Sequence, residues 1–386
     1  MKADFQYDYI IVGAGLSGLH LTHKFLNDKY FKNHKILIID KPKSKLVNKS
    51  FSYWERGNGD WDKLLKNKWS KGKFYSEISE IDMDFSDYNY KTLYSIDFLN
   101  FVKNKIRKNK NLKLIDDSIL KIREEKKQVI VVGNKRNYSC KHVFDSRVNK
   151  KIKENMYKYT SLKQHFVGWV IKTNNKVFNE NSFVFMDYRI RDKNNTAFTY
   201  VLPFDHNEAL IEHTYFSKNE LNKDVYENFI KSYIKKIYDI SEYKILKIES
   251  GIIPMTSYPF HKDSSKKITK IGTAGGWVKS TTGYSFKNCE KYSSEILQNI
   301  KSNKNPSLKP NKVYRFLDKI FLGVLSQYNY KGEGIFYKMI KKNNTNRVLR
   351  FLDEEASLKD IINIIISVRS INFVKVFIKS FYKKTL

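Results

Sequence analysis

Cysteine is scarce and long apolar segments are missing, and these two absences exclude several classes of protein. The two cysteines, Cys140 and Cys289, lie far apart in the sequence, so they provide neither a disulfide framework nor a metal-binding cysteine cluster. No uncharged apolar stretch approaches the roughly 18 residues needed to span a bilayer. The N-terminus also lacks the charged and apolar regions of a secretory signal. We therefore expect a protein of the reducing cytoplasm without a membrane-spanning helix.

Acidic residues are few relative to basic ones, and the formal net charge is +32. The lysines are spread over the whole chain among Asn, Ile and Tyr residues instead of forming one stripe. The sequence also contains no helix-turn-helix, RNP-type or zinc-finger pattern. The charge therefore does not indicate a nucleic-acid-binding protein. It favours attraction to an anionic membrane surface, where each lysine near the leaflet gains about 1 kcal/mol.

The first 40 residues contain the pattern of a nucleotide-binding fold. Residues 8–12 form an apolar strand that leads directly into a G-x-G-x-x-G motif, and a helical pattern follows. In such folds the first glycine allows a tight turn, the second lets the backbone approach a pyrophosphate, and the third lets the helix pack closely on the strand. The helix N-terminus then offers N–H groups and a positive dipole to the phosphates. The motif consists of Gly13, Ala14, Gly15, Leu16, Ser17 and Gly18.

A second buried strand, Ile36–Ile39, is followed by Asp40 and Lys41. Asp40 follows the glycines by about 20 residues, the separation at which an acid binds the ribose hydroxyls of a dinucleotide. We therefore predict a dinucleotide cofactor, bound by the glycine motif together with Asp40 and Lys41.

A second glycine-rich segment occurs late in the chain. The short strand Ile268–Ile271 leads into residues 272–276, and a further turn at residues 281–284 precedes a helix. A plain nicotinamide enzyme has little use for this second segment, so the cofactor is expected to be FAD. We expect the flavin nucleotide to contact Gly272, Thr273, Ala274, Gly275 and Gly283.

Between these segments, residues from about 160 to 260 alternate apolar and polar positions, which indicates an antiparallel sheet. The expected strands are Phe166–Ile171, Phe183–Tyr188, Ala197–Leu202 and Ala209–Phe216. Elsewhere we expect a loop-rich segment at 41–75 and a helix at Ile96–Arg107. Hairpin-like strands are expected through Leu112–Ile122 and Gln128–Val132, a further apolar strand at Tyr138–Phe144, and helices from Pro310 onward.

The predicted fold is mixed α/β (α+β): a Rossmann-like FAD-binding fold is interrupted by an antiparallel β-sheet substrate domain and followed by a helical C-terminal part. We assign residues 1–50, 90–160 and 265–300 to a discontinuous FAD-binding domain. Residues 51–89 and 161–264 are assigned to the substrate-binding domain, and residues 301–386 to the C-terminal helical region.

In their order and spacing, several segments together resemble the flavin-dependent bacterial lycopene cyclases, which form β-ionone rings. These segments are Asp8–Gly18, Ser52–Gly57, Val143–Arg147, Gln164–Trp169, Phe185–Arg189, Tyr200–Phe204, Gly251–Met255, Ile271–Phe286 and Phe351–Glu355. The resemblance implies that the protein isomerises the acyclic ends of lycopene, or of a related carotenoid, into rings. It also implies a need for reduced FAD, with NAD(P)H as reductant, although no net electrons move.

The family's acidic motif is an apolar pair followed by two acids and Thr, and it matches residues 210–214 here. Glu212 keeps the first acid, and the resemblance implies that it is the catalytic proton donor, whereas His213 replaces the second acid. Strand alternation places Leu210, Glu212 and Thr214 on one face. Related flavoproteins also carry an acid after the first glycine of the later flavin motif, where this chain has Thr273, so a backbone contact with the flavin is expected there.

Protonating a carbon–carbon double bond requires an acid in a dry pocket. Burial can raise the pKa of a carboxyl group by up to 3–5 units, so a buried Glu212 could keep its proton near neutrality. The resulting carbocation is stabilised by aromatic walls, which also exclude water, at about 0.5–2 kcal/mol for each ring. A reduced anionic flavin about 4 Å away would add roughly 4 kcal/mol at an effective dielectric of about 20.

Other polar residues can be explained by structural roles instead of catalytic ones. Asp145 and Arg147 lie at a strand end, where they form either part of the cofactor crevice or a surface ion pair. Asp187 is expected to pair with Arg189, and His165 and Trp169 are expected to pack, as is His213 on the opposite face from Glu212.

The segment from Leu358 to Lys384 alternates apolar groups with Lys and Arg. It is either a helix packed on its own domain or a basic amphipathic helix that docks on the inner face of the cell membrane, where a carotenoid substrate dissolves. Rival functions remain open: a flavin-dependent monooxygenase, halogenase or isoprenoid reductase on the same scaffold, or a non-catalytic FAD- or carotenoid-binding protein. The residues do not decide whether one or both ends of lycopene are cyclised.

Overall fold

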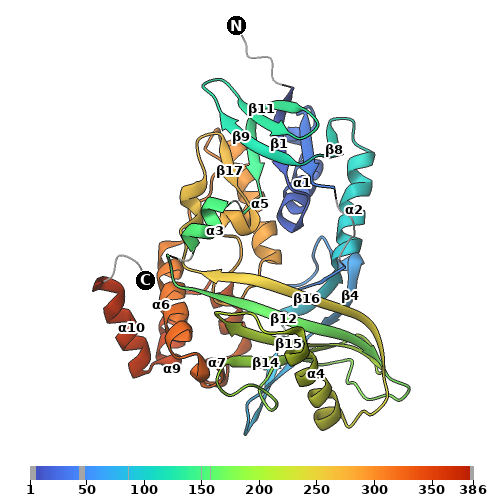
Figure 1. The fold of residues 1–386 in the computed structure, drawn as a ribbon, viewed down its shortest axis with the longest axis vertical. Helices are drawn as coiled ribbons and strands as arrows, with labels where there is room; N and C mark the ends of the chain where they lie inside the picture. The colour runs from blue at the N-terminus through green and yellow to red at the C-terminus, as the bar shows by residue number, and fades with distance from the viewer. Residues whose placement is uncertain (1–5, 43–47, 86, 149, 157, 383–386) are drawn as a thin grey trace.

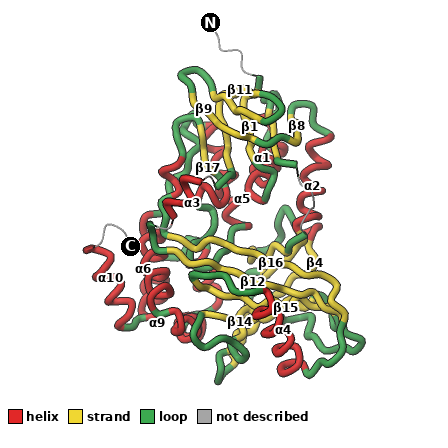
Figure 2. Tube along the Cα trace, in the orientation of Figure 1, coloured by secondary structure: helices red, strands yellow, loops and turns green. Residues whose placement is uncertain are grey.

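The computed structural model describes residues 6–42, 48–85, 87–148, 150–156 and 158–382. Figure 1 shows a nucleotide-type sheet at the top, a broad second sheet across the lower half and the C-terminal helices at the lower left. Strands gather at the top and across the lower half of the molecule, with helices against both regions (Figure 2). The predicted mixed α/β fold class is confirmed.

The first sheet has the strand order β8-β2-β1-β11-β10-β9, with β17 beside β11. Strands β1, β2, β8, β11 and β17 run parallel to one another. Strand β10 runs antiparallel to both of its neighbours, β11 and β9. The central strands are almost wholly apolar because separate clusters of buried side chains cover both faces of the sheet. The bounds are β1 Tyr7–Val12, β2 Ile36–Asp40, β8 Leu112–Asp116, β9 Ile119–Glu124, β10 Val129–Gly133, β11 Asn137–Asp145 and β17 Ile268–Lys270, with helices α1 Leu16–Asn27, α2 Ser95–Arg107 and α5 Phe286–Lys301.

The hairpin-like strands expected through Leu112–Ile122 and Gln128–Val132 are found in part. Strands β9 and β10 form the hairpin, but the chain turns at Asp117, so residues 112–116 form the separate strand β8. The buried Asp117 carboxylate accepts hydrogen bonds from the backbone N–H groups of Asn134 and Lys135 and from the Tyr138 hydroxyl. These donors fix a turn in the middle of the apolar pattern. Strand β8 therefore pairs with β2, and β9 lies at the opposite edge of the sheet.

The second sheet has the order β16-β12-β15-β14-β13-β5-β6. The four strands expected here are confirmed, and β16 extends the sheet beyond β12. One face of the sheet packs on α4, and the other faces the interior of the molecule. The bounds are β5 Lys71–Tyr75, β6 Glu80–Asp84, β12 Ser161–Lys172, β13 Phe183–Asp187, β14 Thr196–Pro203, β15 Glu208–Ser217, α4 Lys223–Tyr238 and β16 Lys244–Thr256.

The loop-rich character expected for residues 41–75 is wrong. Strands β3 (Ser50–Glu55) and β4 (Leu65–Trp69) pair with β7 (Asn89–Tyr94) in a separate three-stranded sheet, and β5 joins the second sheet. The lysines, asparagines and glycines of this segment hide its strands from a pattern based on composition. Buried aromatic side chains, Tyr53, Trp54 and Trp69 among them, stabilise the strands instead.

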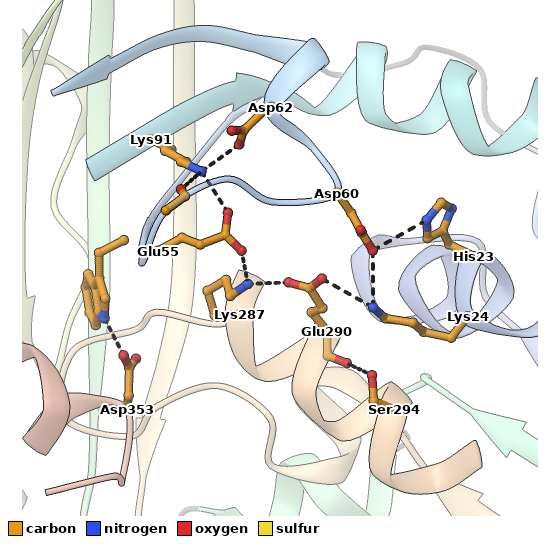
Figure 3. Close-up of polar contacts among 12 residues, drawn as sticks. His23, Lys24, Glu55, Asp60, Asp62, Lys91, Lys287, Glu290, Ser294 and Asp353 are labelled. Carbon is orange, nitrogen blue, oxygen red and sulfur yellow. Dashed lines mark hydrogen bonds and ion pairs between the residues drawn. The ribbon is translucent and has the colours of Figure 1, made fainter. Parts of the chain in front are cut away.

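A chain of alternating charges ties the three-stranded sheet to α5 and α1 (Figure 3). The Lys91 ammonium group, which is fully buried, contacts Glu55 at 2.9 Å and Asp62 at 2.6 Å. Glu55 also pairs with Lys287, which pairs with Glu290. The chain continues from Glu290 to Lys24 of α1, and from there to Asp60 (Figure 3). These ion pairs connect elements that lie far apart in the sequence.

The C-terminal part is helical, as predicted. The helices are α6 Lys312–Gln327, α7 Gly332–Lys341, α8 Thr345–Leu352, α9 Leu358–Val368 and α10 Ile371–Tyr382, and the short helix α3 (Lys150–Met156) lies earlier in the chain. In the part of the chain that the structure describes, no individual helix has both the length and the apolar character to cross a bilayer. Helices α9 and α10 meet those criteria only as a pair, and the pair is bent by 117°.

Candidate active site

One cavity of about 380 Å³ lies between the second sheet, the three-stranded sheet, the two glycine-rich segments and the C-terminal helices. This volume is within the range of pockets that bind small molecules. Its wall is mostly apolar, with a few polar groups at defined positions. The residues that line it include Leu16, Tyr90, Gln164, Phe166, Phe185, Tyr200, Leu210, Glu212, Thr214, Glu249, Thr273, Thr282, Gly283, Tyr284, Phe336 and Leu352.

The glycine motif forms the turn between β1 and α1, as its pattern requires. Gly13 has φ of +102°, a conformation that favours glycine. A Cβ at Gly18 would lie 2.0 Å from the carbonyl oxygen of Gly13, so the close packing of helix and turn depends on this glycine. Beside Gly15 the space is open, since a Cβ there would meet no atom of the described residues within 4 Å. No side chain of these residues caps α1, whose first N–H groups are therefore free to bind phosphate.

The second glycine-rich segment packs directly on the first. Gly272 has φ of +61°, and a Cβ at this position would lie 2.4 Å from the hydroxyl oxygen of Ser17. Residues Gly272–Gly275 form a short 3-10 turn in which Ala274 is buried, and Thr273 lines the cavity. The two glycine-rich segments that the sequence pattern singled out are thus brought together.

Asp40 ends β2 and Lys41 follows it, at the same edge of the sheet as the glycine turn. The N–H of Gly13 donates to the carbonyl of Ile39 at 2.7 Å, which places the residue after Ile39 next to the turn. Lys41 is exposed. Neither residue lines the cavity. A ligand held by both segments would extend from the cavity along this edge.

Two polar atoms in the cavity wall lack protein partners. The buried side-chain oxygens of Gln164 and Thr282 have no hydrogen-bond partner among the residues that the structure describes. Both residues line the cavity, and Gln164 lies against Gly283, whose φ is +74°. Buried polar atoms rarely stay unpaired, so this wall is suited to a polar ligand.

Glu212 lies on β15 with its side chain toward the cavity, together with Leu210 and Thr214 as the strand alternation predicts. The residue is 8% exposed, and its carboxyl group accepts one hydrogen bond, from the Thr214 hydroxyl at 2.9 Å. Burial raises the pKa of the Glu212 carboxyl to about 8, and the nearby charge of Glu249 adds to this shift. At neutral pH this group therefore holds a proton that it can donate.

His213, at the second position of the acidic motif, points to the opposite face. Its ring stacks on Phe229 of α4 with 4.5 Å between centroids, and its Nδ1 lies 3.0 Å from the Thr199 hydroxyl. Burial lowers the pKa of His213 to about 3, so the ring is neutral. His213 therefore packs within the protein, as expected, and does not share the cavity with Glu212.

The cavity wall around Glu212 is aromatic. The hydroxyl of Tyr200 donates to that of Tyr90 at 2.7 Å, and the Tyr90 and Tyr284 hydroxyl oxygens are 2.8 Å apart. Burial raises the pKa of all three phenols well above the usual value, so they stay neutral. Phe166, Phe185 and Phe336 complete this wall. Such a surface excludes water and presents ring faces to a cation.

Three of the segments that carried the resemblance converge beside the cavity. The Trp54 indole N–H donates to the Asp353 carboxylate at 2.8 Å, and Lys279 pairs with Glu354 at 2.9 Å. Burial raises the pKa of Asp353 to about 7. Figure 3 shows Asp353 next to the charge chain, on the far side of Glu55 from α1. These contacts join the C-terminal helices to the second glycine-rich segment.

The other singled-out residues are structural. Asp145 is buried and pairs with Arg147 and Lys270, both at 2.8 Å, so it is not the surface ion pair considered above. The buried Asp187 pairs with Arg189 and accepts a hydrogen bond from Tyr233, as a structural pair should. His165 and Trp169 are buried, as packing residues should be.

Sequence reasoning missed Glu249 and the three tyrosines. Glu249 is a lone acid within β16, and no motif marks it. Tyr90 comes from the three-stranded sheet, Tyr200 from β14 and Tyr284 from the loop before α5, so only the folded chain brings their hydroxyls together.

The fold is that of a flavoprotein. It is similar to a geranylgeranyl bacteriochlorophyll reductase-like protein from Thermoplasma acidophilum, with 13% identity, 97% and 98% of the two chains covered and a TM-score of 0.60. A tryptophan halogenase from Shewanella frigidimarina has 10% identity, 99% and 95% coverage and a TM-score of 0.61. The halogenase PltM, solved in complex with phloroglucinol and FAD, has 11% identity, 97% and 90% coverage and a TM-score of 0.58. At these identities the likeness concerns the fold.

The family is established by the sequence itself. Residues 8–377 match the family described as "Lycopene cyclase protein", which is nearly the whole chain, and the chain therefore belongs to this family. No curated protein matches the sequence significantly.

Proposed function

We propose that the protein is a flavin-dependent lycopene β-cyclase, which isomerises the acyclic ends of lycopene or a related carotenoid into β-ionone rings. The observation that carries the proposal is a buried carboxyl group, Glu212, in an aromatic-walled cavity that extends to both glycine-rich segments, where burial raises its pKa to about 8. Family membership supplies the substrate class. Transferring a proton to an alkene is the task for which such a site is suited.

The residues around the two glycine-rich segments fit FAD. The open space at Gly15 and the uncapped N-terminus of α1 suit the pyrophosphate, and Asp40 and Lys41 suit the ribose. The unpaired oxygens of Gln164 and Thr282 suit polar atoms of the flavin ring. Reduced FAD, with NAD(P)H as its reductant, would supply negative charge near the cavity. The proposed contacts at Gly272, Thr273, Ala274, Gly275 and Gly283 follow from the same arrangement.

The side chains of the cavity have separate roles in the proposed reaction. Glu212 donates the proton that starts cyclisation, and Leu210 and Leu352 belong to the apolar wall that would position the chain end. The aromatic residues stabilise the cation and keep out water, which would otherwise capture it as an alcohol. The product differs from the substrate only in its bonds, so no electrons are consumed.

The exposed face of the last two helices suits a membrane surface. Eight apolar side chains of α9 and α10 are between 44% and 77% exposed: Leu358, Ile362, Ile365, Ile366, Ile371, Val374, Phe377 and Ile378. Lys359, Lys375 and Lys379 are exposed on the same helices, and Arg369 is exposed between them. The eight exposed apolar residues are called the C-terminal apolar face. Apolar side chains flanked by cations suit peripheral binding to anionic lipid, where the substrate dissolves.

Expression in a lycopene-accumulating bacterium, followed by chromatography of the pigments, tests the function. The proposal predicts cyclic carotenoids with one or two β rings. Hydroxylated, halogenated or hydrogenated carotenoids would instead indicate one of the rival flavoenzymes of similar fold. Unchanged lycopene, with FAD bound to the purified protein, would indicate a binding protein.

A further inference from the structure

Two carboxyl groups face the cavity from the strands on either side of β12, which lies between β16 and β15 (Figure 1). In the pairing of β12 with β15, Glu212 is opposite Gly168. In the pairing of β12 with β16, Glu249 is opposite the same Gly168. Residues directly opposite each other in a sheet point to the same face, so both glutamates point into the cavity that both line. With strands about 4.8 Å apart, their α-carbons are about 10 Å apart.

Gly168 leaves the space between the two glutamates free of a side chain. A Cβ at Gly168 would lie 3.2 Å from the Cβ of Glu212 and 3.4 Å from its Cγ. The Glu212 side chain therefore lies close over the glycine, in the gap between the two outer strands. Any larger residue at this position would stand between the two carboxyl groups.

The two carboxyl groups have different surroundings. Glu212 accepts one hydrogen bond, from Thr214. The Oε2 atom of Glu249 instead accepts from the backbone N–H of Ser50 at 3.1 Å and from its hydroxyl at 3.0 Å, and it lies 2.8 Å from the Lys247 ammonium. Two hydrogen bonds and an adjacent ammonium group on one oxygen suit an ionised carboxylate. Its Oε1 has no hydrogen-bond partner within the described ranges, so this oxygen can accept a proton.

We propose that Glu249 is the base that removes the proton from the ring cation, so that Glu212 and Glu249 each carry out one of the two proton transfers. The proposal rests on the cyclase function proposed above. A pair of carboxyl groups held in different states by their surroundings is the usual arrangement for an acid and a base in one site.

The Glu212 proton adds to the terminal double bond, whose π electrons form the new C–H bond and leave a tertiary cation. The next double bond attacks this cation, forms the ring C–C bond and moves the positive charge to its far carbon. Glu249 then takes the proton from the ring carbon beside that charge, and the C–H electrons become the ring double bond. Return of a proton from Glu249 to Glu212 through solvent restores both groups, and no electrons are gained or lost.

The position of the base decides the ring type. Removing the proton from the ring-junction carbon gives the β ring, whereas loss of a proton from a neighbouring carbon or from the methyl group places the double bond elsewhere. Glu249 is thus assigned as a specificity-determining group as well as a catalytic one.

The test uses the holoenzyme with reduced FAD and lycopene, and compares Glu249→Gln with the wild type. Gln keeps the shape and can still accept from Ser50, but it is a very weak base. We expect unchanged flavin binding, a rate at least about 100-fold lower and a mixture of ring isomers by chromatography and NMR. Glu208→Gln is the matched control, because Glu208 lies on β15 outside the cavity and pairs with Lys66. It should leave rate and ring type unchanged.

A second variant covers the case in which Glu249→Gln does not fold. Glu249→Asp keeps the carboxylate but moves it back toward the strand by one methylene group. We expect a slower enzyme that yields a mixture of ring isomers. If the wild type forms β rings and the folded Glu249 variants do so at the same rate, Glu212 or another group removes the proton and this proposal is wrong. If the wild type forms no ring, the cyclase function itself fails.

Discussion

Gly18 in the first turns of α1 lies against the carbonyl oxygen of Gly13, and a Cβ at Gly18 would come within 2.0 Å of it. This contact sets the distance between α1 and the turn after β1. Gly15, between them, has open space beside it. The two positions therefore respond differently to a larger side chain.

Gly15→Val should leave the protein folded and reduce FAD affinity at least about 100-fold, or about 2.7 kcal/mol. The added side chain fits the protein but occupies the space where the backbone would approach a pyrophosphate. Gly18→Ala should instead lower the melting temperature of the flavin-free protein, because its Cβ meets backbone atoms. Flavin fluorescence titration and a thermal melt separate these effects. Tight FAD binding by Gly15→Val would show that the pyrophosphate lies elsewhere.

The raised pKa of Glu212 predicts the direction of a pH effect on stability. In the unfolded chain this carboxyl group ionises near pH 4.5, whereas the folded protein keeps it protonated up to about pH 8. Between these values the folded state binds more protons, so the contribution of Glu212 to the free energy of unfolding falls as pH rises and is constant above about pH 8. The total change is a few kcal/mol at most.

Denaturant unfolding of wild type and Glu212→Gln at pH 5, 7 and 9 measures this effect. We expect the variant to gain stability relative to the wild type as pH rises, since Gln does not ionise. Cyclisation by the wild type should decline above about pH 8, where Glu212 loses its proton. A constant stability difference across this range would mean that Glu212 is ionised in the folded protein.

Lys91→Met tests the charge chain of Figure 3. Lys91 is fully buried and contacts two carboxylates and the Gly57 carbonyl, so its removal leaves partly buried negative charge without its partner. We expect destabilisation of about 3–5 kcal/mol. Lys235→Met is the control, because it breaks an exposed pair with Asp239 and should change the free energy of unfolding by about 0.5 kcal/mol or less. Equal effects of the two substitutions in chemical denaturation would show that the chain contributes little.

The membrane proposal is tested by substitution and not by truncation. Helices α9 and α10 also bury Ile361, Ile364, Val368 and Val376, and removing them would open the core. We expect Ile362→Ser, Ile366→Ser, Phe377→Ser and Ile378→Ser together to reduce binding to anionic liposomes at least about 10-fold, with little change in melting temperature. Ile78→Ser and Leu120→Ser, which are exposed elsewhere, are controls. Undiminished sedimentation of the fourfold variant with liposomes would exclude docking through the C-terminal apolar face.

The sequence predicts those parts of the fold and site that depend on local pattern. The glycine motif, the strand alternation around Glu212 and the C-terminal helices all follow from residues close together in the chain. The strands at residues 65–75 escape prediction because lysines occupy their exposed positions. The domain bounds stay a prediction.

Glu249 and the tyrosines escape prediction for a different reason. The place of Glu249 beside Glu212 depends on β16 pairing with β12 in a register that aligns both glutamates with Gly168. Pairing between strands about 80 residues apart leaves no local signature.

The central claim is that cyclisation starts with a proton delivered by Glu212. The most direct measurement is the mass of the ring product formed anaerobically in D₂O by the holoenzyme with reduced FAD. The account predicts one deuterium for each ring formed, no stoichiometric consumption of NAD(P)H, and no labelled ring from Glu212→Gln. A ring product without deuterium, a labelled ring from Glu212→Gln at the wild-type rate, or a product whose formation consumes NAD(P)H would contradict it.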